Sequence, residues 1–283
     1  PATETRRCSY VELVAAGPQI PDWFVSHWWG EPVCQFFLCI EQHCEDRGLG
    51  PGTAYWVCAY ANNQWDLGDE VTTDPADSSF KRALDMARGT LSIVDQGAVK
   101  YSRIWCVFEV WVTLKMSDRK LYDMYVAHDH VRVDQYNAEN KHCGPKNAIG
   151  ITSGYAATDY GVAYYKTIRE KAFPPSVCSR MMQISLEQAD ASIPSDKVHI
   201  LNSIIGKTGH DLEDEPLPRS PMYDDLNRCL RGKYAAACWR FALEGGLDMV
   251  KFRDALRSAS VDVLTLSFSG CKQADDAHAA LIG

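Results

Sequence analysis

The stretch Arg103-Ile-Trp-Cys-Val-Phe-Glu-Val-Trp-Val-Thr113 carries the clearest structural pattern of the chain. Apolar side chains recur in it at intervals of three and four residues, which is the spacing of a helix that packs one face into a core. Trp105 and Glu109 lie four residues apart, so they share a different face of the predicted helix. A carboxylate beside an aromatic ring is typical of a cleft residue and also of a surface acid. Because glutamate is rarely buried unless it is paired, the spacing alone favours the surface.

The segments before and after this helix alternate between strand and helix patterns. Short apolar runs predict strands at residues 23–26, 55–60, 89–94 and 122–127, and the run at 55–60 is typical of a central parallel strand. Helices are expected from Glu31-Pro32 to Gly48 and over residues 80–88, with Ser79 as a cap. The polar loop 61–79 exceeds the usual length of about 2–6 residues, which is typical of a functional loop. This alternation predicts an α/β fold with a flavodoxin-like, doubly wound parallel sheet.

Ligands of such sheets bind outside the carboxyl ends of the strands, so the strand ends supply the candidate site. Aromatic walls with a few polar groups suit a planar ligand that carries hydroxyl groups. The candidate residues at these ends and on the helix are Ser26, His27, Trp28, Trp29, Asn62, Trp65, Asp66, Trp105 and Glu109. An alternative stays open for three of the tryptophans, which could serve only as packing residues at the bases of loops.

Two motifs resemble the TIR (Toll/interleukin-1 receptor) domain family. The family carries a Ser-x-Trp-Cys-x-x-Glu-Leu helix, and this chain has Ser102…Trp105-Cys106-x-x-Glu109-Val110, with two residues between the serine and the tryptophan instead of one. Asp22-Trp-Phe-Val-Ser26 is similar to the family's opening strand. The resemblance covers residues 20–128, and the Arg-Asp and Pro-Gly pairs of the family's long loop are absent between residues 61 and 79. The string Ser-His-Trp-Trp-Gly-Glu also resembles TIR-like proteins of algal protists.

The resemblance implies an enzyme that cleaves NAD and releases nicotinamide, as an NAD hydrolase or cyclase. Glu109 would be the catalytic residue, residues 26–29 one pocket wall, and residues 62–66 the start of a self-association loop. NAD would be the substrate, with no cofactor and no metal, and many such enzymes act only when assembled. A second function is a non-enzymatic scaffold that assembles with itself or with other TIR-like domains, and a third is a nucleotide-binding protein. The enzyme predicts that Glu109 lines an open pocket with Trp28, Trp29 or Trp105. The scaffold predicts that Glu109 is tied to a neighbouring Arg or backbone donor in a filled site.

Composition narrows the classes of partner. The formal net charge of −8 argues against nucleic acid or an anionic membrane as the main partner, because both need a basic surface. No apolar run approaches the roughly 20 residues that span a bilayer, and no secretory signal is evident. The eleven cysteines include no Cys-x-x-Cys pair, and Cys34, Cys39, Cys58 and Cys106 lie in apolar patterns, so we expect reduced, mostly buried thiols in a cytoplasmic protein. Adjacent side chains on a strand do not converge, so residues 128–130 (His-Asp-His) predict no metal site.

The chain divides into three parts by pattern. Residues 1–135 form the TIR-like α/β domain, residues 136–175 a linker and loop region rich in Gly, Asn and Thr, and residues 176–283 a smaller helical region. Within the last part, helices are expected at 176–189, 195–205, 222–243 and 248–257. Residues 261–271 alternate like a strand.

Overall fold

The computed structural model describes residues 2–67, 72–116, 120–127, 130–141, 146–153, 168–170, 172–243 and 248–257. Its strands are β1 (Trp23–Ser26), β2 (Tyr55–Trp56), β3 (Gly89–Ile93), β4 (Leu121–Val126) and β5 (Ile149–Ile151). Its α-helices are α1 (Tyr10–Val14), α2 (Val33–Arg47), α3 (Cys58–Ala61), α4 (Ser79–Met86), α5 (Ile104–Lys115), α6 (His130–Glu139), α8 (Pro175–Met181), α9 (Pro194–Ile204), α10 (Pro221–Leu243) and α11 (Met249–Arg257). Short 3-10 helices lie at Pro75–Asp77 (η1), Val99–Ser102 (η2), Leu186–Gln188 (η4) and Gly209–Glu213 (η5).

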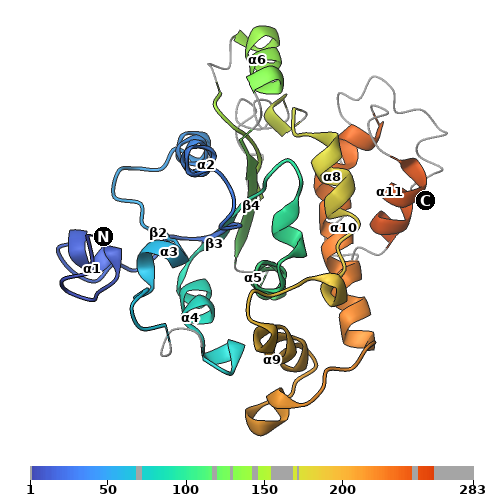
Figure 1. Cartoon of the computed structure of the whole chain (residues 1–283). Coiled ribbons are helices and arrows are strands. Elements are labelled where there is room, and N and C mark those ends of the chain that lie inside the picture. The colour runs from blue at the N-terminus through green and yellow to red at the C-terminus, as the bar shows by residue number, and fades with distance from the viewer. Residues whose placement is uncertain are drawn as a thin grey trace.

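The five described strands form one sheet in the order β2-β1-β3-β4-β5 (Figure 1). The first four run parallel, and β5 pairs antiparallel with β4. Helices flank this sheet, and a helical region that includes α8, α10 and α11 lies beyond it. The chain is therefore an α/β fold with a mostly parallel sheet, followed by a helical C-terminal region, as the alternating pattern predicted.

Strand β1 shows how the two faces of the sheet are used. Successive side chains on a strand point to opposite faces. Trp23 and Val25 pack with Phe36 of α2 in one hydrophobic cluster, whereas Phe24 belongs to the cluster on the other face with α4 and α5. Ser26 has the parity of Phe24, so its hydroxyl group is directed toward the α5 side. This parity places a polar side chain of β1 within reach of Glu109.

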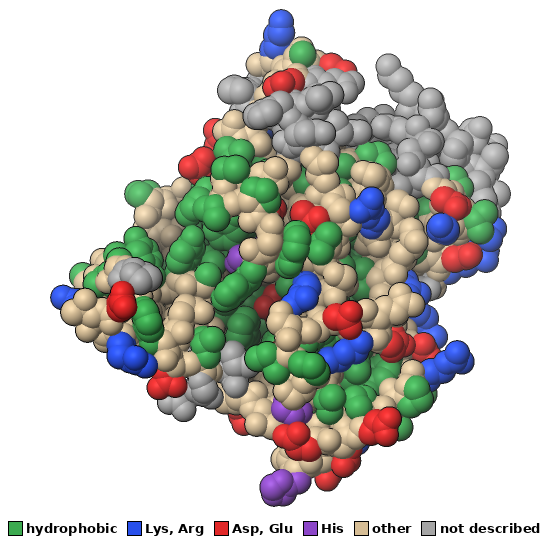
Figure 2. Space-filling view, viewed as in Figure 1, with side chains coloured by type: hydrophobic (Ala, Val, Ile, Leu, Met, Phe, Trp, Pro, Cys, Tyr) green, Lys and Arg blue, Asp and Glu red, His purple; other side chains and the backbone are tan. Residues whose placement is uncertain are grey.

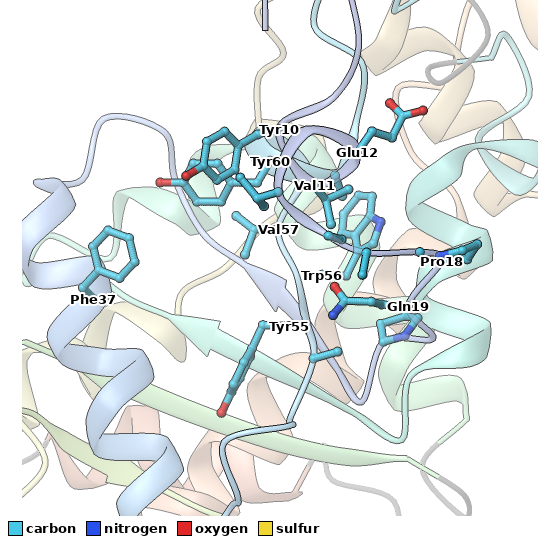
Figure 3. A pocket seen from close by; sticks show the side chains of 17 residues that line it. Tyr10, Val11, Glu12, Pro18, Gln19, Phe37, Tyr55, Trp56, Val57 and Tyr60 are labelled. Atoms are coloured by element: carbon cyan, nitrogen blue, oxygen red, sulfur yellow. The ribbon is translucent and has the colours of Figure 1, made fainter. Parts of the chain in front are cut away.

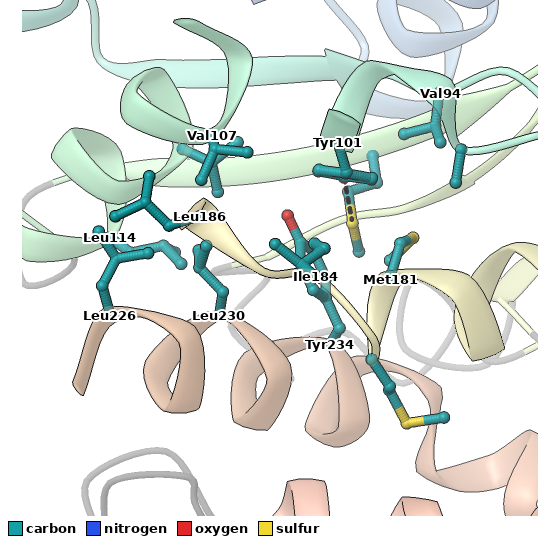
Figure 4. Close-up of a cluster of buried hydrophobic side chains, with 14 of the residues drawn as sticks. Val94, Tyr101, Val107, Leu114, Met181, Ile184, Leu186, Leu226, Leu230 and Tyr234 are labelled. Carbon is teal, nitrogen blue, oxygen red and sulfur yellow. Dashed lines mark hydrogen bonds between the residues drawn. The ribbon is translucent and has the colours of Figure 1, made fainter. Parts of the chain in front are cut away.

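The core on the α5 face continues into the C-terminal helices. Tyr101, beside α5, packs in the same cluster as Met181 of α8, and Leu226 and Tyr234 of α10 (Figure 4). The backbone of Asp190 also joins the two regions, because its N–H donates to the carbonyl of residue 102 and its carbonyl accepts from the N–H of residue 104. Burying apolar surface at about 25 cal/mol per Å² makes such a continuous cluster a major source of stability. The helical region therefore completes the core of the sheet.

Several predicted helices are confirmed. The helix expected after Glu31-Pro32 is α2, and it ends at Gly48 with φ 60°, a left-handed conformation that glycine adopts at little cost. The helix expected around Trp105 and Glu109 is α5. Helices α9, α10 and α11 occupy the segments predicted for them to within about one residue at each end.

The second strand was predicted wrongly in length and in place. β2 contains only Tyr55 and Trp56 and lies at an edge of the sheet, and the chain then enters α3 at Cys58. An edge strand has one neighbour to hold it, and alanine, which occurs twice in α3, favours helix over strand. The apolar residues 55–60 therefore do not form one continuous strand, and an apolar run alone indicates only that a segment is expected to be buried.

Three further expectations need correction. Loop was predicted from residue 137 to residue 160, yet α6 extends to Glu139 and β5 lies within this segment. The cap of α4 is Ser78, whose hydroxyl oxygen accepts the N–H of Lys81, so Ser79 begins the helix. Helix α8 ends at Met181, eight residues before the predicted end, because the chain continues as turns and η4.

The structure also tests the expectations about the cysteines and about membrane-spanning segments. The cysteines whose side chains are described, Cys8, Cys34, Cys39, Cys44, Cys58, Cys106, Cys178 and Cys229, are free. Cys39, Cys58 and Cys106 are buried as expected, but Cys34 is exposed. Among the described residues, no helix is both long and apolar enough to cross a membrane. The predicted strand at 261–271 and the pair His128-Asp129 lie outside the described residues.

Candidate functional site

The candidate site lies where the topology of the sheet reverses. The chain passes from β1 to β2 on one side and then to β3 on the other side of β1. In open α/β sheets, ligands bind outside the carboxyl ends of the two strands that border such a switch point. Here those ends are Ser26 of β1 and Ile93 of β3, which are the last residues of paired strands.

A buried hydrogen-bond chain occupies this position. Lys100, which is fully buried, donates from Nζ to the carbonyl oxygen of Ser26 at 2.9 Å and to its Oγ at 2.6 Å. The Ser26 hydroxyl group donates in turn to Oε2 of Glu109 on α5. An ammonium group only donates, so Lys100 fixes the direction of the serine proton toward the carboxylate. The result is a Lys100–Ser26–Glu109 chain in which each member orients the next.

The loop after β3 holds Lys100 in place. The N–H of Ala98 donates to the carbonyl oxygen of Asp95 at 2.8 Å, and the N–H of Lys100 donates to Oδ1 of Asp95 at 3.4 Å. Ala98 has φ 52°, in the left-handed region that a residue with a Cβ rarely adopts. Such strain persists only where the surroundings determine it, and it is frequent at functional sites.

A tight turn after β1 brings Glu31 back to the strand end. The N–H of Glu31 donates to the carbonyl oxygen of Trp28 at 3.1 Å. The Trp28 ring lies against the backbone of Gly30, where a Cβ would overlap the ring. Glycine therefore allows the turn to close beneath the tryptophan. The carboxyl group of Glu31 is buried, and neither of its oxygens has a hydrogen-bond partner among the described residues.

His27 lies next to this turn on the α2 side of the sheet. Its ring packs edge-on against Phe36 with 4.8 Å between ring centroids. Nδ1 lies 3.3 Å from the carbonyl oxygen of Trp28, which can only accept, so Nδ1 carries the proton. Burial lowers the pKa of His27 to about 4, so the ring is neutral at pH 7. Its Nε2 is therefore an acceptor, and it too lacks a partner among the described residues.

The carboxyl groups of Glu109 and Glu31 hold their protons unusually tightly. Burial raises the pKa of Glu109 to about 7, although Lys100 and the bond from Ser26 act against the rise. Burial, reinforced by the charge of Asp95, raises the pKa of Glu31 to about 7. Burial likewise lowers the pKa of Lys100. One ammonium group thus faces three carboxyl groups, so the cluster has an excess of negative charge when all of them ionise.

Two buried thiols line the α5 side of the cluster. Cys58 accepts the indole N–H of Trp29 at 3.1 Å, and Cys106 donates to the carbonyl oxygen of His27 at 3.5 Å. Burial raises the pKa of both thiols to about 12, with the charge of Glu109 adding to the rise. Because the thiolate is the reactive form of cysteine, these two residues act as small apolar groups.

The structure brings together only part of the predicted site. Ser26 and Glu109 are in contact, and His27, Trp28 and Trp29 lie in the adjoining turn. Glu109 itself is only 5% exposed, so it does not line an open pocket as the enzyme predicted. Its partner is the side chain of Ser26, and not the arginine or backbone donor that the scaffold predicted.

The remaining predicted residues lie elsewhere or contact other elements. Trp105 donates to Asp196 of α9 at 2.8 Å and stacks on Phe80 of α4, so it faces away from Glu109. Trp65 donates to Thr3 at 3.0 Å, close to the N-terminus. Asp66, which follows it, is exposed.

Asn62 is buried at the end of α3, where its backbone N–H donates to the carbonyl oxygen of Cys58 at 3.1 Å. None of the hydrogen bonds found among the described residues joins Asn62 to Ser26, Lys100 or Glu109, although the charge of Glu109 acts on Cys58.

Sequence reasoning missed Lys100, Asp95 and Glu31. Asp95 and Lys100 lie in the loop that follows the third predicted strand, and the rule on strand ends already pointed to that loop. Glu31 lies in the Ser-His-Trp-Trp-Gly-Glu string, where it resembled a first-turn helix acid. Nothing in the sequence shows that these side chains turn inward.

A separate cavity of about 920 Å³ opens beside the edge strand β2 (Figure 3). Its walls come from α1 and the segment after it, Phe37 of α2, β2 and α3, and none of the nine predicted site residues lines it. The carboxylate of Glu12 accepts from Ser9 in the cap of α1, so this acid is already engaged. Of the described residues that line the cavity, Glu12 has a lowered pKa and Tyr55 a raised pKa. The switch point brings together more such groups, most of them buried, so it is the stronger candidate for chemistry.

Hydrophobic side chains gather between α1 and the centre of the molecule, with a histidine and acidic groups showing among them (Figure 2). Among the described residues, no group of three or more His, Cys, Asp or Glu side chains is placed to hold a metal ion.

Comparisons of this chain with protein-family models, with curated proteins and with solved structures find no match.

Proposed function

We propose that this protein is a TIR-like enzyme that cleaves the nicotinamide–ribose bond of NAD at the switch point between β1 and β3. The observation that carries the proposal is the buried Lys100–Ser26–Glu109 chain, because it puts the glutamate of the TIR-like helix at the position where this kind of sheet binds ligands. The strand order 2-1-3-4-5 is that of flavodoxin-like folds, which supports a ligand site at this switch point.

The reaction is a hydrolysis without a redox step. The bond between ribose C1′ and the pyridinium nitrogen breaks, and its electron pair leaves with nicotinamide, which becomes neutral. Water adds to C1′ and loses a proton, giving ADP-ribose. The sugar passes through an oxocarbenium-like state, as in glycoside hydrolysis. In a cyclase, a nucleophile from the ligand replaces water.

The electrostatics of the cluster suit this chemistry. A carboxylate near the ribose stabilises the positive charge that develops on the sugar. The excess of carboxyl groups over ammonium groups also favours a substrate whose pyridinium ring is cationic. A pKa of about 7 for Glu109 lies near neutral pH, where a general base is most effective.

One observation favours the scaffold as a second candidate. Glu109 is almost fully buried and tied to Ser26, so a substrate reaches it only if the turn after β1 moves. A scaffold would keep this arrangement as a structural element. In the enzyme, the closed site is a resting state that opens on ligand binding or on assembly, as the resemblance to TIR enzymes leads us to expect.

Nicotinamide release tests the proposal. The purified chain is incubated with NAD at low and high protein concentration and in a crowding agent, beside the variant Glu109→Gln. We expect release by the wild type that rises with protein concentration and is lost in the variant. Glutamine keeps an oxygen that accepts from Ser26, so the variant should fold, and its thermal unfolding is measured as a control. Release that persists in Glu109→Gln would contradict the catalytic role of Glu109. No release from the wild type in any condition would favour the scaffold.

A further inference from the structure

Two buried acceptors at the end of β1 have no donor. Both carboxyl oxygens of Glu31 and the Nε2 atom of His27 are buried, and none of these three atoms has a hydrogen-bond partner among the described residues. Glu31 is 7% exposed, which is unusual for a glutamate. An unpaired buried polar group destabilises a folded protein, and a charged one does so more strongly. A folded protein that retains three such atoms in one place requires an explanation.

The two side chains face the same environment. Each interacts electrostatically with Lys100. His27 packs on Phe36 of α2, and Glu31 interacts with Cys39, one turn further along the same helix. Both therefore lie on the α2 side of the strand end, opposite the side on which Ser26 meets Glu109.

Most of the neighbouring donors are already engaged. Lys100 uses two of its three N–H bonds on Ser26. The indole N–H of Trp29 points to Cys58, and the backbone N–H of Glu31 points to residue 28. Asp95 adds a third acceptor group, since its charge acts on Glu31. The α2 side of the switch point is therefore rich in acceptors and short of donors.

We propose that Glu31 and His27 form a subsite that binds the vicinal hydroxyl pair of a ribose through the hydroxyl protons. A carboxylate accepts two adjacent hydroxyl groups with its two oxygens, as acidic residues do for ribose in dinucleotide-binding folds. His27, held neutral with its proton on Nδ1, accepts from the ligand at Nε2. This inference extends the proposed function by naming a second recognition element, yet it concerns binding and does not require that NAD be cleaved.

The subsite gives Glu31 a role that differs from the role of Glu109. Glu109 is oriented by Ser26 and Lys100 before any ligand arrives. Glu31 is paired only when the ligand is present, so its burial destabilises the ligand-free protein and favours the complex. Binding sites often carry such a conflict between stability and function.

The test joins a stability measurement with a binding measurement on the full chain. Glu31→Met replaces the carboxyl group with an apolar side chain of similar length, and His27→Phe removes the second acceptor while keeping a ring against Phe36. Glu41→Met is the matched control, because Glu41 is an exposed glutamate on α2. The probes are ADP-ribose, ribose 5-phosphate and 2-deoxyribose 5-phosphate, with titrations followed by NMR. The first two probes separate a nucleotide from a simple sugar phosphate, and the third lacks one hydroxyl of the pair.

We expect the wild type to bind a ribose probe and to bind the deoxy probe at least about tenfold more weakly. Glu31→Met should raise the melting temperature by about 2–4 °C and weaken ribose binding at least about tenfold. His27→Phe should also raise the melting temperature and weaken ribose binding. Glu41→Met should change neither. A fall in melting temperature for both site variants, equal binding of the deoxy probe, or no binding of any probe would overturn the inference.

The outcomes separate this inference from the proposed enzyme. Ribose binding that depends on Glu31, in a protein that releases no nicotinamide, keeps the subsite and rejects the hydrolase. Nicotinamide release with an unchanged KM in Glu31→Met keeps the hydrolase and rejects the subsite.

Discussion

Lys100 Nζ lies 2.6 Å from Oγ of Ser26, a residue 74 positions earlier in the chain. The contact joins the end of β1 to the loop after β3, and through the serine hydroxyl it reaches Glu109 on α5. The end of β1 thus meets two neighbouring elements that come more than 70 residues later in the chain. The charge of a buried lysine is costly unless it is paired, so the contact sets both the stability and the chemistry of this region.

Replacing Lys100 with methionine should therefore change two properties together. The variant leaves Glu109 in a buried site without its cation, so its pKa should rise further, because Lys100 now lowers it. Removing one partner of a buried charged pair lowers the free energy of unfolding by about 3–5 kcal/mol. The loss is smaller here if Glu109 takes up a proton, because its buried charge then disappears. Urea unfolding gives the stability, and NMR titration of the carboxyl carbon gives the pKa. Lys251→Met, at an exposed position, should change neither.

The pH dependence of stability provides a second prediction. The pKa of Glu31 is about 7 in the folded protein, above its ordinary value of 4.5. Between these values the folded protein holds a proton that the unfolded chain has lost, so the free energy of unfolding falls as pH rises from about 4.5 to 7. At 1.36 kcal/mol per pKa unit the effect is about 3 kcal/mol.

Urea unfolding of the wild type and of Glu31→Met across this pH range measures the effect. The advantage of the variant over the wild type should grow with pH and level off above about pH 7. A difference that is constant with pH would mean that Glu31 ionises normally in the folded protein.

Gly30 offers a test of the turn after β1. A Cβ at this position would overlap the ring of Trp28. Gly30→Ala should displace the tryptophan and, with it, Glu31, at a cost of about 1–3 kcal/mol. Gly52→Ala is the control, because nothing lies within 4 Å of a Cβ placed there. Tryptophan fluorescence and urea unfolding report the two effects, and equal behaviour of the variants would argue against close packing at the turn.

Asp123 tests a polar network at a distance from the proposed site. Its carboxylate accepts from Arg47 at 2.6 and 2.7 Å and lies 3.0 Å from Nε2 of His43. Burial raises the pKa of Asp123, but the bonds from His43 and Arg47 outweigh it and hold the pKa below its ordinary value. The stability that this network adds is therefore lost as pH falls through that lowered pKa.

Asp123→Ala should destabilise the protein by about 3–5 kcal/mol, since it removes the buried carboxylate that pairs with Arg47. Ribose binding per folded molecule should stay the same, because Asp123 contacts none of the residues of the Lys100–Ser26–Glu109 chain. A loss of binding at full folding would show that the two regions are coupled.

Much of the fold could be predicted from local patterns. The apolar spacing of residues 104–114 predicts α5, and the proline and glycine at its ends predict α2, because one face of each helix must be buried. The pattern could not separate β2 from α3, since residues 55–61 are apolar throughout and burial does not reveal the backbone conformation. β5 was also missed, because a short strand in a polar segment depends on its pairing with β4.

The site could be predicted only to the level of its position. Ser26 and Glu109 lie where the strand-end rule and the helix motif place them, and they are in contact. Trp105 shares the helix with Glu109, but the choice between facing the cluster and facing α9 depends on Asp196, a partner 91 residues away. Lys100 and Glu31 could not be recognised, because a charged residue in a loop is usually exposed and only tertiary contacts turn it inward.

The most direct measurement is the NMR response of the carboxyl carbons of Glu31 and Glu109 to added ADP-ribose. A ligand at the switch point should shift both signals in a saturable way and leave Glu12, beside the separate cavity at β2, unchanged. Saturable shifts at Glu12 with none at Glu31 and Glu109 would place the ligand in that cavity and would contradict a binding site at the Lys100–Ser26–Glu109 chain.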